Sequence, residues 1–178
     1  MLANLPAVIF TIGHSTRGLE EFVAVLRGHG VEQVLDVRSL PGSRRYPHFD
    51  REALAVSLPA AGLAYQHLPA LGGRRRARSD SPNTGWTHAS FRGYADYMQT
   101  AAFAAGLDEA EALARAHASA LMCAEAVPWR CHRSLLGDAF ACHGWTVLDI
   151  LGPGAAKPHR LTPFLRVGPQ GELLYPRG

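Results

Sequence analysis

Lysine is almost missing from this chain: Lys157 is the only one, although lysine and arginine together number 18 and the formal net charge is +3. Arginine therefore carries nearly all of the positive charge, and its flat guanidinium group suits bidentate contact with phosphate or carboxylate. A GC-rich genome would also enrich arginine and alanine. The composition is thus compatible with an anionic ligand but does not require one.

Cysteine is scarce too. The three cysteines are an odd number and too few for a disulfide scaffold, which predicts a reducing, cytoplasmic environment. No stretch approaches the roughly 20 apolar residues that a membrane span needs, so we expect no membrane partner. The apolar stretch from Val8 to Ile12 lacks a basic leader and a small-residue cleavage site, and is expected to be a strand rather than a signal peptide.

Internal repeats are absent, and the remaining pattern is one of apolar runs alternating with amphipathic stretches. The runs predict five strands, over residues 8–12, 33–38, 63–68, 120–124 and 146–151. Helices are predicted between them: one capped by Ser15 or Thr16, one capped by Asp50, a helical region from Phe91 to about His117 that breaks at Gly106, and one over residues 132–143.

This alternation predicts a three-layer, Rossmann-like α/β fold, in which a mostly parallel sheet of about five strands carries helices on both faces. At 178 residues the chain suits a single α/β domain over residues 1–178, with the motifs within about 8–151. The tail, residues 152–178, is predicted to form a small hairpin or an extended arm.

Uncommon polar residues gather at the predicted carboxyl ends of four strands, where ligands bind in such folds. His14 and Ser15 follow the first strand, Asp36 and Arg38 end the second, Gly72 and Gly73 lie just past the third, and Glu125, Cys131, His132 and Arg133 follow the fourth. Arg44, in a turn after the second strand, is a further candidate anion-binding residue. Convergence of four segments on one edge predicts a binding site there.

Cys131 is the predicted nucleophile of this site. It lies between Arg130 and Arg133 at the start of a predicted helix, and both the charges and the helix terminus favour a thiolate. In this hypothesis His132, His14 and Glu125 serve as catalytic groups. The alternative is that Cys131 is a buried structural cysteine.

The candidate catalytic residues are Cys131, His132, His14 and Glu125, and the candidate substrate- or anion-binding residues are Ser15, Asp36, Arg38, Arg44, Gly72, Gly73 and Arg133. Cys123 is expected in the core, and Cys142 is expected to be structural at the far end of the helix. A zinc site would need Cys123, Cys131 and His132, but there is no C-x-x-C pair and the adjacent Cys131 and His132 are expected to diverge, so neither a metal nor a cofactor is predicted.

The longest irregular segment runs over residues 69–90 and contains several arginines, among them Arg74 and Arg78. Loops of this length are usually functional or disordered. We expect residues 72–88 to be mobile without ligand and to close over the site as a phosphate-gripping lid. The alternative is a solvated loop with no contact to a ligand.

Several ordered motifs resemble those of the bacterial family catalogued as domain of unknown function 488. They are Thr11-Ile12-Gly13-His14-Ser15, Leu35-Asp36-Val37-Arg38 with Pro41 and Ser43-Arg44, Leu71-Gly72-Gly73, Phe91 with Gly93-Tyr94-Ala95 and Met98, and Leu121-Met122-Cys123-Ala124-Glu125 with Cys131-His132-Arg133. The likeness spans about residues 8–151 and implies a single α/β domain in a soluble bacterial protein, with no reaction to carry over.

A weaker likeness is to rhodanese-type folds and thiol phosphatases, which also place a cysteine loop before a helix. This chain departs from both patterns, because Cys123 has no arginine five residues later and Cys131 has Arg133 only two residues later. Sulfur transfer or dephosphorylation is therefore an analogy alone.

Two function classes remain open. The first is an enzyme acting on a phosphorylated or otherwise anionic substrate, with Cys131 as nucleophile. The second is a non-catalytic nucleic-acid or nucleotide binding module, in which the arginine loop contacts phosphate and Trp86, Phe91 and Tyr94 stack on bases. The small net charge and the lack of a nucleic-acid motif favour the enzyme, and the oligomeric state is left open.

Overall fold

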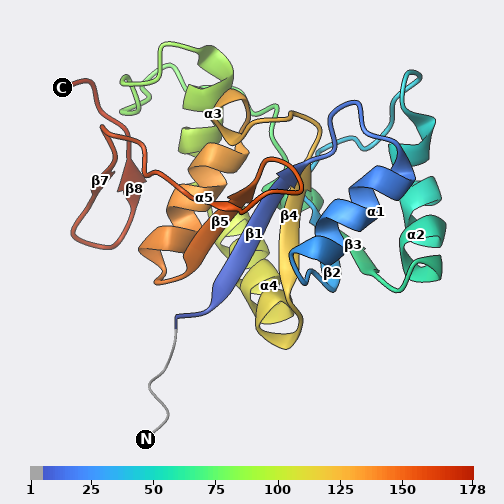
Figure 1. The fold of residues 1–178 in the computed structure, drawn as a ribbon. Helices are drawn as coiled ribbons and strands as arrows, with labels where there is room; N and C mark the ends of the chain where they lie inside the picture. The colour runs from blue at the N-terminus through green and yellow to red at the C-terminus, as the bar shows by residue number, and fades with distance from the viewer. Residues whose placement is uncertain (1–5) are drawn as a thin grey trace, which may run out of the picture.

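The computed structural model describes residues 6–178, so residues 1–5 of the predicted domain lie outside the described part. Its main sheet has six strands in the order β3-β2-β4-β1-β5-β6 (Figure 1). In that order the strands are β3 (Ala64–His67), β2 (Gln33–Asp36), β4 (Ser119–Cys123), β1 (Val8–Gly13), β5 (Thr146–Ile150) and β6 (Lys157–Pro158). The first five run parallel, and β6 pairs antiparallel with β5 at the edge.

Five α-helices connect and cover the strands. They are α1 (Leu19–Gly28), α2 (Arg51–Ala60), α3 (Ala89–Tyr97), α4 (Ala101–Ala116) and α5 (Arg133–Cys142). Three short 3-10 helices, η1 (Pro47–Phe49), η2 (Pro69–Leu71) and η3 (Pro128–Arg130), lie in the loops. Each of the five strands predicted from apolar runs is present, within about two residues of its predicted ends.

A separate apolar core lies on each face of the sheet. On one face, Phe22 and Leu26 of α1 pack with Leu54 and Leu58 of α2. On the other, buried residues of α3, α4 and α5 pack together, Tyr94, Phe103 and Phe140 among them. Helices on both faces of a mostly parallel sheet confirm the predicted three-layer α/β fold.

Two predicted helix boundaries are wrong for identifiable reasons. Neither Ser15 nor Thr16 caps α1, whose N-cap is Gly18; Ser15 instead adopts a left-handed conformation, with φ 52°, in the loop before it. Gly106 does not break the helical region, because it lies inside α4. A Cβ there would meet that of Ala70 at 2.9 Å, so this glycine allows η2 to pack closely on α4.

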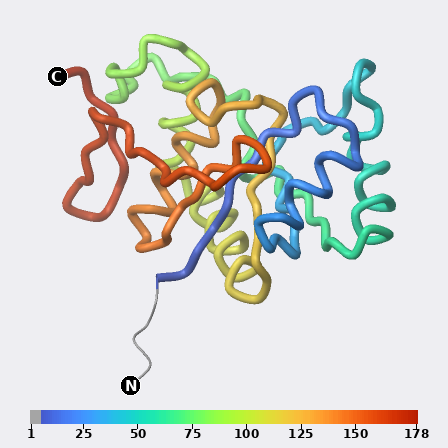
Figure 2. The backbone as a smooth tube through the Cα atoms, in the orientation of Figure 1, coloured from blue at the N-terminus to red at the C-terminus, as the bar shows by residue number. Residues whose placement is uncertain are grey.

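The tail forms the predicted hairpin, although β6 first adds an unforeseen antiparallel edge to the sheet. Strands β7 (Arg166–Val167) and β8 (Leu173–Leu174) pair with each other, and Figure 2 shows this red segment beside the orange α5. Tyr175, which directly follows β8, is fully buried, and its hydroxyl donates to Asp138 of α5 at 3.0 Å. The tail is therefore part of the packed structure.

The segment over residues 72–88 also differs from the expected mobile lid. Asp96 of α3 accepts hydrogen bonds from the Arg78 backbone, the Ser81 hydroxyl and the Asn83 side chain, at 2.8, 2.5 and 2.8 Å. Asn83 is fully buried, and Trp86 stacks on Phe91 with the ring centroids 4.9 Å apart. A buried carboxylate thus anchors a segment that has no apolar stripe.

Within residues 6–178, no helix is long and apolar enough to cross a membrane.

Candidate functional site

A cavity of about 540 Å³ lies beyond the carboxyl ends of β1, β2 and β4. Its wall is built from the loops that follow these strands. Two backbone hydrogen bonds join the loops after β1 and β4: the His14 N–H donates to the Cys123 carbonyl and the Ser15 N–H to the Ala124 carbonyl, both at 2.9 Å. The residues that line it are His14, Ser15, Thr16, Arg38, Ser39, Leu40, Gly42, Ser43, Tyr46, Gly73, Arg74, Cys123, Ala124, Glu125, Ala126 and His132.

Most of the predicted site residues lie at or directly behind this wall. Those that line the cavity are His14, Ser15, Arg38, Gly73, Glu125 and His132. Asp36, Cys131 and Arg133 are buried behind it. Arg44 is exposed and does not line the cavity. Gly72 is buried, and a Cβ at this position would overlap Ser39.

Arg38 is held rigidly over the cavity. Its Nε and Nη2 donate to the two oxygens of Asp36 at 2.9 and 2.7 Å, and Nη2 also donates to the Phe49 carbonyl at 2.7 Å. One Nη1 hydrogen faces His14 Nε2 at 3.3 Å. Since a guanidinium group has five N–H donors, one Nη1 hydrogen remains for a ligand.

The two histidines of the wall have fixed tautomers. His14 Nδ1–H donates to the Ser15 carbonyl at 2.9 Å, and His132 Nε2–H donates to the Val37 carbonyl at 2.8 Å, because a carbonyl can only accept. Burial lowers the pKa of both imidazoles. Each ring is therefore neutral near pH 7, and His132 presents the lone pair of Nδ1.

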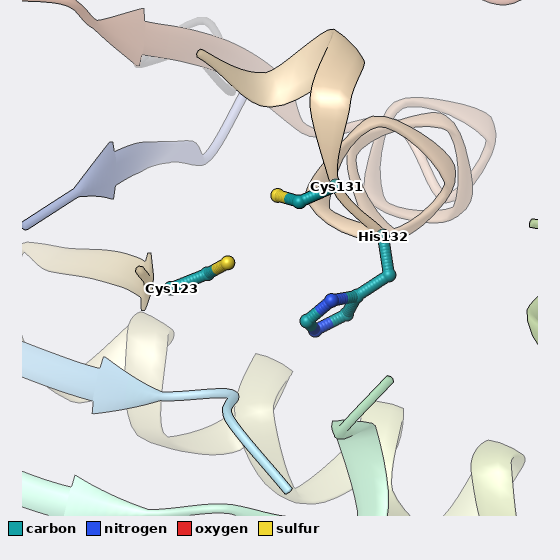
Figure 3. Close-up of side chains that lie close together, drawn as sticks. All are labelled: Cys123, Cys131 and His132. Carbon is teal, nitrogen blue, oxygen red and sulfur yellow. The ribbon is translucent and has the colours of Figure 1, made fainter. Parts of the chain in front are cut away.

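Cys123, Cys131 and His132 converge on one point (Figure 3). The two sulfurs and a ring nitrogen of His132 all lie within 4.8 Å of one another. The expected divergence of Cys131 and His132 is therefore wrong. Cys123 is the last residue of β4 and lines the cavity, while Cys131 lines a second cavity of about 240 Å³ on the other side of His132.

The pKa values of the two thiols are shifted in opposite directions. The pKa of Cys123 is lowered, mainly by a hydrogen bond with the Cys131 thiol and also by the nearby charge of Arg133. The same hydrogen bond, together with burial, raises the pKa of Cys131. Cys123, whose position in a strand had suggested a core residue, therefore has the more acidic thiol of the two.

Arg133 supplies the positive charge next to this pair. It is fully buried, and its Nε donates to Cys131 Sγ at 3.3 Å, its Nη1 to Thr11 at 3.2 Å and its Nη2 to the Glu125 carbonyl at 2.5 Å. Among residues 6–178 it forms no ion pair with a carboxylate. A buried cation favours a compensating negative charge, and the thiol of Cys131 is the titratable group that Arg133 contacts.

Two sulfurs and an imidazole are also ligands that zinc or copper(I) favours. His132 even has the usual outer contact of a metal-bound histidine, because its other nitrogen donates to a carbonyl. Arg133, however, already contacts Cys131 with a positive charge. That contact favours a free thiolate over a bound cation.

Cys123 and Tyr46 line the cavity although they were not among the predicted site residues, whereas Arg74 belongs to the segment that was predicted as an arginine lid. Cys123 carried a usable signal, because it ends its strand level with Gly13 of β1 in the same way as the predicted site residues end theirs. Arg74 is exposed at the rim, with a φ of 60°. Nothing in the turn sequence distinguishes Tyr46 from its neighbours.

The family model described as "Domain of unknown function DUF488" matches residues 18–140. The matched range begins just before α1 and ends within α5, so it includes Arg38, Cys123, Cys131 and Arg133. No curated protein and no solved structure matches the chain.

Proposed function

Because the chain belongs to the DUF488 family, whose description names no activity, we propose a function from the site itself: an enzyme that acts on a small anionic, for example phosphorylated, substrate in the strand-edge cavity, with Cys123 as the nucleophile. The observation that carries this proposal is the contact between Arg133 and the cysteine pair. Arg133 is fully buried and contacts the Cys131 sulfur and no carboxylate, so its positive charge lies beside the cysteine pair and favours a thiolate within that pair.

Cys123 is the nucleophile in this proposal, in place of the Cys131 favoured by the sequence. It lines the cavity, and Cys131 and Arg133 form a chain behind it: the Arg133 Nε–H points to the Cys131 sulfur, whose own proton points to Cys123. Cys131 thus transmits the charge of Arg133 to the nucleophile.

The anionic part of the substrate binds at Arg38 and Arg74. Arg38 has one free N–H donor. Because Asp36 immobilises it, its side chain loses little conformational entropy when a ligand binds. Arg74 is exposed at the rim and can close onto a ligand. Ser15 and Gly73 add backbone surface to the same wall.

Proton transfer falls to His132. Its Nδ1 is unprotonated and belongs to a neutral ring, one nitrogen of which lies within 4.8 Å of both sulfurs. His14 is less suited, because its Nε2 already faces Arg38. Glu125 lines the cavity with an exposed side chain and remains a candidate acid.

The binding-module alternative gains no support from the aromatic residues on which it depends. Tyr94 is fully buried and donates its hydroxyl to the Leu71 carbonyl at 2.8 Å. The Trp86 ring packs against Phe91 and Phe164, at centroid distances of 4.9 and 5.0 Å. These rings therefore serve packing rather than base stacking.

Alkylation of the native protein by iodoacetamide tests the proposal, with the modified residue assigned by mass spectrometry. We expect Cys123 to react at a lower pH than an ordinary thiol of pKa about 8.5, and inorganic phosphate to slow the reaction. The variant Cys142→Ser serves as the background, because it removes the exposed cysteine and leaves the pair intact. An inert Cys123, or reaction that phosphate leaves unchanged, would count against the proposal.

A further inference from the structure

We propose that Cys123 and Cys131 form a redox pair that reduces small anionic disulfides: Cys123 attacks the substrate, and Cys131 resolves the mixed disulfide that results. This inference rests on the proposed function, because it requires Cys123 to be the nucleophile of the cavity. It goes further by assigning a role to the second thiol and a chemical class to the substrate.

The positions of the two sulfurs carry the argument. They come from different elements, the end of β4 and the loop before α5, yet lie within 4.8 Å of each other. A disulfide requires about 2.05 Å between sulfurs, so a short approach suffices. Cys131 follows η3 with an extended backbone, φ −144° and ψ 172°, and lies in neither the strand nor the α-helix. It is therefore the partner that can move.

A second thiol is required as a reactant in only one class of thiol chemistry. In acyl or phosphoryl transfer, water removes the group from the cysteine, and a second thiol is not required. When the group is attached through sulfur, another thiolate must attack the sulfur–sulfur bond to release it. Cys131 stands where that attack begins, next to the sulfur of Cys123 (Figure 3).

The reaction balances in two steps. The Cys123 thiolate forms a bond to one sulfur of the substrate R–S–S–R, and the substrate's sulfur–sulfur bond breaks to release RS⁻. Cys131 then gives its proton to His132 Nδ1 and attacks Cys123 Sγ, which expels the second RS⁻. Protons from His132 and solvent yield two thiols, and the protein, oxidised by two electrons, carries a Cys123–Cys131 disulfide. A dithiol reductant restores it.

The surroundings assist each step. Arg133 Nε, 3.3 Å from Cys131 Sγ, favours the thiolate of the resolving cysteine once its hydrogen bond to Cys123 is lost. Arg38 and Arg74 on the cavity wall select a disulfide that carries carboxylate or phosphate groups. A cavity of about 540 Å³ fits a small molecule and not a folded protein partner.

The test mixes the reduced, metal-free protein with oxidised glutathione, an anionic disulfide, without air, and follows the protein by mass spectrometry. In the Cys142→Ser background we expect the Cys123–Cys131 disulfide and release of two thiols per protein. The added substitution Cys131→Ser should stop the reaction at a glutathione adduct on Cys123, and Cys123→Ser should abolish it. The neutral bis(2-hydroxyethyl) disulfide should react about tenfold more slowly, because it lacks the charge-assisted contacts.

The outcomes separate this inference from the proposed function. If iodoacetamide alkylates Cys123 but oxidised glutathione leaves the pair reduced, the redox inference fails and the nucleophile stands. If the Cys142→Ser protein also stops at the mixed disulfide, Cys131 is not a resolving cysteine. Equal rates for the charged and neutral disulfides would overturn the substrate class. If zinc binds the reduced pair and blocks it until a chelator is added, Cys123 and Cys131 are metal ligands and both proposals fail.

Discussion

Arg133 donates its Nε–H to the sulfur of Cys131 at 3.3 Å, so a fully buried guanidinium group has a thiol where a carboxylate would be expected. Arg133 is linked to a carboxylate through Thr11, whose hydroxyl accepts a hydrogen bond from Arg133 at 3.2 Å and donates one to Asp149 at 2.6 Å. This arrangement places a positive charge and two polarisable sulfurs at the carboxyl edge of the sheet. It is the feature from which the chemistry of the site follows.

Replacing Arg133 should therefore slow the thiols without emptying the cavity. We expect Arg133→Met to lower the rate of Cys123 alkylation at pH 7 about tenfold, the usual worth of one charge-assisted hydrogen bond, and to move the pH profile of that rate upward. Arg133→Lys keeps the charge and should restore part of the rate. Near-UV circular dichroism checks that both variants remain folded, and an unchanged pH profile in Arg133→Met would show that the guanidinium group does not act on the thiols.

Gly13, next to the site, and Gly28, far from it along α1, should respond oppositely to an added methyl group. A Cβ at Gly13 would overlap the Glu125 carbonyl oxygen, so Gly13→Ala must displace the loop that holds Arg133. We expect a loss of about 3 kcal/mol in the free energy of unfolding, measured by urea denaturation. Gly28→Ala, at the end of α1 and in open space, is the matched control and should gain up to about 1 kcal/mol. Equal stability of the two variants would contradict the packing described for Gly13.

The fold was predictable where one local pattern decides the outcome. Apolar runs located the largely buried strands β1, β2, β4 and β5, whereas the predicted strand 63–68 contains β3, an edge strand of exposed and half-buried residues. Gly106 misled because its role is contact with Ala70, a residue distant along the chain. The short edge strand β6 was missed because two exposed residues carry no apolar pattern.

The sequence predicted which strand ends line the cavity, but not the electrostatics of its wall. Strand ends locate His14, Arg38 and His132 correctly on the cavity wall. The acidities of Cys123 and Cys131 depend on their mutual hydrogen bond, which joins residues from different elements. In the sequence, the position before a helix and the neighbouring arginines favoured Cys131 as the more acidic thiol. In the structure, the contact between the two thiols lowers the pKa of Cys123 and raises that of Cys131.

His159 should make stability depend on pH. Its ring lies between Asp138 and Asp149, at 3.0 and 3.4 Å, and although burial alone would lower the pKa, these hydrogen bonds raise it to about 9. Because the pKa is higher in the folded state, protonated His159 stabilises the protein. This contribution is fully present below the unfolded pKa near 6.5 and is lost as the pH rises through 9. We expect the free energy of unfolding to fall by about 3 kcal/mol across that range.

His159→Gln is the variant that isolates this effect, because an amide can hydrogen-bond but does not titrate in that range. The variant should be less stable than the parent at pH 6, and the difference should shrink towards pH 9. Urea denaturation at a series of pH values provides the measurement. A constant difference across the series would mean that His159 is uncharged in the folded protein.

Asp96 should control the accessibility of the segment over residues 72–88. This carboxylate accepts hydrogen bonds from Arg78, Ser81 and Asn83, so the segment is expected to resist trypsin despite its arginines. Asp96→Ala removes all three bonds and leaves their donors without a partner, which should increase the rate of cleavage after Arg78 several-fold. Asp80→Ala is the matched control, because Asp80 forms only an exposed ion pair with Arg78 and should change the rate little. Rapid cleavage of the unsubstituted protein after Arg78 would instead restore the mobile lid that the sequence predicts.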